Sequence, residues 1–149
     1  MILPALLAYG HYLSILLVIS SLVVELFVFG QKLSQREMRI LQRADGYYGL
    51  GAILVLITGF LRVYNFGKGP DYYFSNSVFL TKLSLFIVVG LLSIYPTIIF
   101  LRWRKLKNTE DGIELDFNQY KKVRRFILLE TILVFMLPLL AAMMARGIG

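Results

Sequence analysis

The amino-acid sequence predicts an all-α integral membrane protein, a bundle of four transmembrane helices with short connections. Hydrophobic residues make up 58% of the 149 residues and the mean hydropathy is +0.70, more apolar than an ordinary soluble domain. Residues 83–101 carry no charged side chain, and a helix of about 20 apolar residues crosses the hydrocarbon core of a bilayer. At about 1.5 Å per residue, the chain is long enough for four such spans.

The four spans are expected to form a single transmembrane domain, residues 1–149. The first begins near Pro4, since proline is favoured in the first turn of a helix. Only His11 and Glu25 interrupt its apolar run. The four spans are predicted at residues 4–30, 46–64, 78–102 and 124–145.

Local signals mark the ends of the later helices. Asn76 or Ser77 is expected to cap the third span, because short polar side chains accept hydrogen bonds from the first free amides. Asp116, followed three residues later by Gln119, resembles a capping box and predicts the start of the fourth helix. Pro96 lies inside the third span and is expected to kink it.

An amphipathic segment is expected at the cytoplasmic surface, between the first two spans. In residues 31–45, Leu33, Ile40 and Leu41 recur at helical spacing among charged residues. This pattern is typical of a helix that lies at the interface. A solvated connector is the alternative interpretation.

The net charge of +7 is read as topology information. In a soluble protein it would suggest a nucleic-acid partner, but here the basic residues flank apolar runs, so we expect a lipid bilayer and no nucleic acid. Twelve basic residues fall on the side of the first and third connections and three on the other. The positive-inside rule therefore places both termini outside the cytoplasm. The three are Arg62, Lys68 and Arg146; the twelve are Lys32, Arg36, Arg39, Arg43, Arg102, Arg104, Lys105, Lys107, Lys121, Lys122, Arg124 and Arg125.

Cysteine is absent from the chain, which excludes disulfides, thiolate metal sites and thioether-linked haem.

Glycines in the second span indicate close helix packing. Gly46, Gly49, Gly51 and Gly59 would let a neighbouring helix approach closely. This surface is also where two subunits could pack, and a homo-oligomer is expected.

Depth sorts the polar residues of the spans into two layers. His11, Lys82 and Arg62 should share the outer half, because the helices that carry them enter or leave on that side. The inner layer holds Glu25 and Glu130, which should pair with Arg43 or Arg102 beside Asp45. Ionisable groups inside a membrane are candidates for function. The alternatives are a packing role for His11 and snorkelling of Lys82 to the interface.

The passage DGYYGLGAILVLITGFLRV, with FGKGPDYYFSNSVFLTKLSLF, resembles a family of small bacterial four-helix membrane proteins of unknown function. This resemblance implies the bacterial inner membrane. More distantly the chain is similar to HemJ-type protoporphyrinogen oxidases and CopD-like bundles. His11 in YGHYLSILL and Lys82-Leu83 in FLTKLSLF match two HemJ positions, which implies a b-type haem. The further helix 3 histidines of HemJ-type sequences are missing here.

Three hypotheses for function follow. The first is a redox membrane protein that binds haem b or another tetrapyrrole, with His11 as metal ligand and Lys82 and Arg62 meeting carboxylates. Its second axial ligand would be Lys82, a methionine, water or His11 of another subunit. The second is a transport or channel-like component with the polar layers along its path. The third is a non-enzymatic accessory subunit. The sequence leaves open whether the protein is an enzyme.

Overall fold

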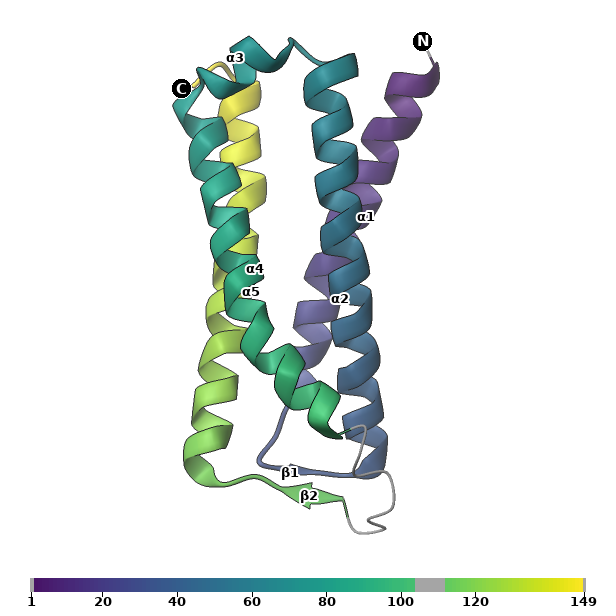
Figure 1. Cartoon of the computed structure of the whole chain (residues 1–149), viewed down its shortest axis with the longest axis vertical. Helices are drawn as coiled ribbons and strands as arrows, with labels where there is room; N and C mark the ends of the chain where they lie inside the picture. Colours follow the sequence, from purple (N-terminus) through teal and green to yellow (C-terminus); the bar gives the residue numbers. More distant parts are fainter. Residues whose placement is uncertain (1, 104–111, 149) are drawn as a thin grey trace.

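The computed structural model describes residues 2–103 and 112–148, and four long helices build it (Figure 1). They are α1 (Ile2–Val28), α2 (Gln35–Leu61), α4 (Ser77–Trp103) and α5 (Phe117–Ala145). Each is long and apolar enough to cross a membrane, and the structure is 86% helical. The predicted fold class, a four-helix membrane bundle, is therefore confirmed.

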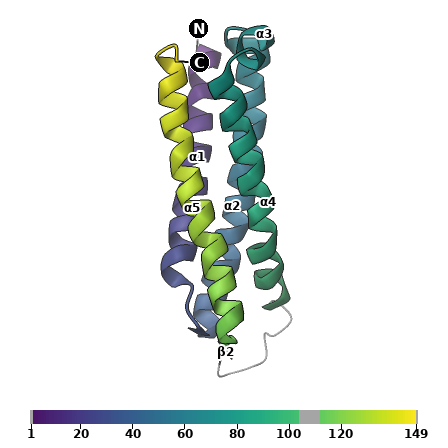
Figure 2. The same ribbon diagram turned by 90° about the vertical axis from the view of Figure 1, so that its left-hand side faces the viewer.

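The bundle has two distinct ends (Figures 1 and 2). Both chain termini and the short helix α3 (Pro70–Phe74) lie at one end, which we call the termini end. Strands β1 (Lys32–Leu33) and β2 (Ile113–Glu114) lie at the other, the strand end. This is the arrangement that an even number of spans requires.

The second helix differs from the prediction. Residues 35–61 form one continuous helix, so the predicted interfacial segment and the second span are parts of the same element. Ser34 and Glu37 form a capping box that starts it, and Gly46 alone, at about 1 kcal/mol relative to alanine, does not end a helix. The helix then passes into the π-helical turn η1 (Arg62–Phe66).

The connection at the strand end contains structure that the sequence analysis missed. Strands β1 and β2 pair antiparallel, with Lys32 opposite Glu114 and Leu33 opposite Ile113. The Lys32 Nζ and Glu114 Oε2 atoms lie 3.5 Å apart, on side chains 78% and 60% exposed. A surface pair of this kind contributes under about 1 kcal/mol, so backbone pairing is the main link between the two loops.

Helix caps match the predictions closely. The Asn76 side chain accepts a hydrogen bond from the Phe79 amide at 2.9 Å and starts α4. Asp116 caps α5, although its side chain accepts from the Asn118 amide and not from Gln119. Helix α4 runs unbroken through Pro96 and bends toward α2 in its lower half (Figure 1).

The best-packed core lies at the strand end. Helix α1 packs along α2 and α4 along α5, and aromatic residues join the two pairs there. Phe29 stacks on Trp103 and Tyr120, and Phe100 is fully buried beside them. A second cluster, which includes Val18, Leu22 and Val134, occupies the middle of the bundle. Many large apolar side chains on the outside stay exposed, as a lipid-facing surface requires.

Candidate functional site

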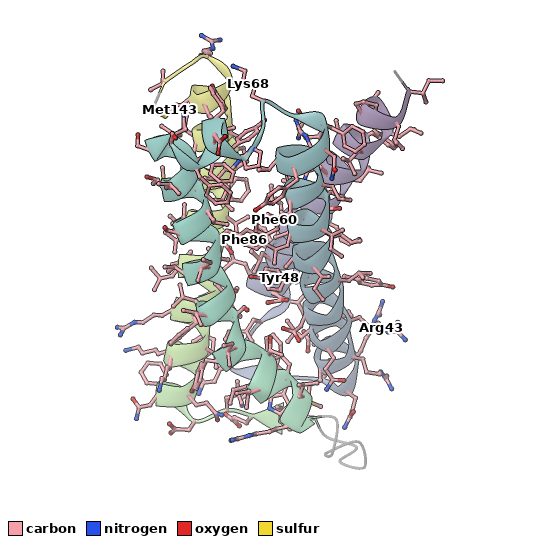
Figure 3. The ribbon with its side chains drawn as sticks, turned by 45° about the horizontal axis from the view of Figure 1, so that its top comes forward. Arg43, Tyr48, Phe60, Lys68, Phe86 and Met143 are labelled. Carbon is pink, nitrogen blue, oxygen red and sulfur yellow. The ribbon has the colours of Figure 1, made fainter. Side chains whose placement is uncertain are left out.

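A cavity of about 510 Å³ opens between the helices in the half of the bundle nearer the termini. We call it the termini-end cavity. All four long helices and η1 contribute to its wall, which is mostly apolar. Phe60 and Phe86 face one another across it from α2 and α4 (Figure 3). Its polar wall residues are His11, Tyr12, Arg62, Tyr73 and Lys82. The structure thus brings together His11, Arg62 and Lys82, which the sequence analysis assigned to one layer.

The His11 ring is held by Thr58 of α2, with 2.8 Å between Nδ1 and Oγ1. The Thr58 hydroxyl lies 2.6 Å from the Leu54 carbonyl oxygen, an acceptor that takes its single proton. The hydroxyl oxygen therefore accepts from His11 Nδ1–H. This bond fixes the tautomer in which Nε2 carries the lone pair. Among the described residues Nε2 has no hydrogen-bond partner, so this nitrogen is free to bind a metal.

The two basic side chains of the cavity rest on aromatic rings. The Arg62 guanidinium lies 5.9 Å from the centre of the Tyr12 ring, and the Lys82 ammonium lies 5.4 Å from that of Phe79. The cavity wall contains no Asp or Glu, and neither basic side chain has an ion pair in the described ranges. Cations without carboxylates in a mostly apolar space favour an anionic ligand.

A second group of polar residues lies closer to the strand end. Glu25 of α1 and Glu130 of α5 are 3% and 2% exposed. Asp45 of α2 accepts a hydrogen bond from the Thr97 hydroxyl of α4 at 2.6 Å. Glu25 is within electrostatic range of both other carboxyl groups. We call Glu25, Asp45 and Glu130 the carboxylate layer.

The predicted ion pairs of Glu25 and Glu130 with Arg43 or Arg102 are wrong. Both arginine side chains are exposed, and Arg43 points away from the bundle (Figure 3). Within residues 2–103 and 112–148 the structure forms a single ion pair, at the strands. Arg104, Lys105 and Lys107, which were predicted to lie on the more basic side of the membrane, are outside the described residues.

Three further residues belong to these sites and were not predicted from the sequence. Thr58 of α2 lies four positions before Arg62, the first residue of η1, and this spacing places both on one face of the helical segment. Tyr48, 6% exposed, lies near Glu130, Glu25 and Asp45, and it follows Asp45 by three positions on the same face. Met144 lines the cavity, but nothing separates it from its apolar neighbours in the sequence.

One comparison with known proteins identifies the family. Residues 3–149 match the family described as Predicted membrane protein (DUF2214). The chain belongs to this family. No curated protein and no solved structure gave a match. The predicted membership in a membrane-protein family of unknown function is therefore confirmed, whereas the similarity to HemJ-type and CopD-like proteins stays a prediction.

Proposed function

We propose that the termini-end cavity binds an amphipathic anion, and that this ligand is haem b or a related tetrapyrrole with a redox role. The observation that carries the proposal is that apolar surface and cationic side chains line the same cavity. As far as the described residues form it, the wall is mostly apolar and lacks carboxylates, yet it presents one imidazole and two cations. An apolar macrocycle with carboxylate side chains has complementary features.

The residues present fit such a group. Nε2 of His11 would ligate the iron, and the bond from Nδ1 to Thr58 is the kind of support that ligating histidines have. Arg62 would pair with a propionate. Lys82 or Met144, both in the wall, would also hold the group, and Lys82 would ligate a metal only as the neutral amine. The bound iron would supply one-electron chemistry.

A haem ligated by two histidines would need His11 from two chains, since the sequence holds one histidine. His11 faces the interior of its own bundle and contacts α2 there. This geometry favours a mixed ligand set within one chain. The expected homo-oligomer stays a prediction that a haem-to-chain ratio of one to two would support.

A transport path is the weaker alternative. Its support is the presence of polar residues at two depths. The apolar cluster at the strand end, with Phe100 and Leu41 fully buried, closes the bundle below both groups. Closure at one end favours a binding site over a continuous channel.

The cationic side chains should contribute to haem affinity through their charge. Comparing haem with an uncharged derivative measures this contribution separately. We expect Arg62→Gln to bind haem about tenfold or more weakly, because a hydrogen bond to a charged group contributes about 1.5–3 kcal/mol. Haem dimethyl ester, whose propionates are neutral, should bind wild type and variant alike. Optical titration in detergent measures both. Lys68→Gln is the control, since Lys68 contacts Tyr72 outside the cavity wall. Equal losses for haem and its ester would contradict the assignment.

The orientation in the membrane follows from the charges. We infer that the strand end faces the cytoplasm of a bacterial inner membrane, because most of the described basic residues lie in or next to the connections at that end. These nine residues are Lys32, Arg36, Arg39, Arg43, Arg102, Lys121, Lys122, Arg124 and Arg125. The cavity would then open toward the outer half. Both chain ends would lie outside the cytoplasm.

Because the chain has no cysteine, single cysteines report the orientation without background. An impermeant maleimide added to intact spheroplasts should label Ser75→Cys at the termini end and leave Glu114→Cys at the strand end unlabelled. Both positions are exposed. After lysis both should react. Labelling of Glu114→Cys before lysis would reverse the assigned orientation.

A further inference from the structure

Two carboxyl groups of the carboxylate layer are buried without partners. Oε1 of Glu25 and Oε1 of Glu130 are inaccessible to solvent and make no hydrogen bond. The side chains are 97–98% enclosed, on two helices that pack against each other, α1 and α5. They are also within electrostatic range of one another. A buried polar atom that lacks a partner is costly, so it calls for a specific explanation.

Among the described residues, the groups that face this pair carry no positive charge. Helix α2 contributes the Asp45 carboxyl and the Tyr48 hydroxyl. Helix α4 contributes hydroxyls, those of Thr97, bound to Asp45, and of Ser93, near Tyr48. On α5 the neighbouring Thr131 donates to the backbone carbonyl of Ile127. No lysine, arginine or histidine of the described chain pairs with either glutamate.

Three ionised carboxylates in such a place would repel one another without compensation. Removing one unpaired ion from water is costly even after relaxation, and the bilayer removes the remaining solvent. A protonated carboxyl avoids that cost, and it can both donate and accept a hydrogen bond. A metal ion is a poorer explanation, because among the described residues no three His, Cys, Asp or Glu side chains are placed to hold one.

We propose that Glu25 and Glu130 form a buried proton-binding site, which exchanges protons with water through Asp45, the one half-buried carboxyl group of the carboxylate layer. Each carboxylate takes one proton from the aqueous phase on loading and returns one on release, with no change of redox state. The site does not depend on the ligand of the cavity. The site lies close to the cavity, since Val134 lines the cavity and Glu130 lies one helical turn, about 6 Å, before Val134 in α5.

Infrared spectroscopy of the purified protein in detergent tests this proposal. At neutral pH the wild type should show the C=O stretching band of protonated carboxylic acids. Transfer to D₂O should shift the band, because the protons exchange. Glu25→Gln and Glu130→Gln should each lose part of it. The matched control is Glu114→Gln, which changes an exposed carboxyl group paired with Lys32 and should leave the band unchanged.

Several results would overturn the proposal. One is a wild-type spectrum without the acid band, and another is an unchanged band in both glutamine variants. A band that fails to shift in D₂O would exclude exchange. Loss of the band on adding Na⁺ at fixed pH and ionic strength would assign the site to a metal cation instead. If a glutamine variant does not fold, Glu25→Asp and Glu130→Asp should keep the acid band at a shifted frequency, and its absence there would contradict the proposal equally.

Discussion

Gly51→Leu is expected to destabilise the protein strongly. Gly51 is buried where α2 crosses α1, and a Cβ atom there would lie 2.9 Å from Val18 Cγ2 and 3.2 Å from two α1 backbone atoms. Overpacking of a tight contact costs about 1–3 kcal/mol, and backbone atoms cannot rotate away. A leucine should therefore push α1 from α2 and separate His11 from Thr58. Thermal unfolding in detergent, followed by circular dichroism, should show a clearly lower midpoint.

Gly46→Leu is the matched control on the same helix. A Cβ atom at Gly46 meets nothing within 4 Å, and leucine favours a helix over glycine by about 0.5–1 kcal/mol. This variant should be as stable as the wild type or slightly more stable. Equal midpoints for the two leucine variants would show that the close contact at Gly51 contributes little.

The fold was predictable because its signals are strong and local. Long apolar runs predicted the four spans, and Asn76 and Asp116 predicted where α4 and α5 begin. The start of α2 was missed because amphipathicity in residues 31–45 was read as a separate interfacial helix. The glycine prediction was correct for Gly51, whereas a Cβ atom at Gly46 or Gly49 would meet no atom of the described residues within 4 Å. Glycine content alone does not reveal which face of a helix meets a neighbour.

The two polar layers were predicted unequally well. Depth along a helix follows from residue number, so His11, Arg62 and Lys82 could be assigned to one level, and they do share the cavity. Rotation about the helix axis was ignored in the other layer. Arg43 and Asp45 are two positions apart and so point to nearly opposite sides of α2. Asp45 faces Thr97 while Arg43 faces outward, which is why the predicted ion pairs are absent.

His11→Ala is expected to have the largest effect on the proposed ligand. The substitution removes the only imidazole of the chain and with it the residue that would hold the iron. Haem affinity should fall more than it does for loss of a supporting residue, which typically costs about 10–100-fold. Residual binding through Arg62 and the apolar wall should lack the spectrum of a histidine-ligated iron. Unchanged thermal unfolding would show that the variant keeps its fold.

Thr58→Val tests the tautomer that the hydrogen bond fixes. Valine keeps the shape of threonine but removes the acceptor of His11 Nδ1–H, so haem affinity should fall by about 10–100-fold. Thr81→Val is the control: its hydroxyl also donates to a carbonyl of the preceding turn, that of Ser77, at 2.9 Å, but Thr81 is outside the cavity wall. Equal affinities in the two valine variants would contradict a role for Thr58.

The most direct test of the central claim is the visible absorption spectrum of the purified protein reconstituted with haem, measured for wild type beside His11→Ala. The wild type should show a Soret band that saturates with added haem and is distinct from that of haem in empty micelles. The His11→Ala spectrum should lose this band or shift it. A wild-type spectrum identical to haem in micelles, or the same Soret band in both proteins, would contradict His11 as the ligand of a haem in this cavity.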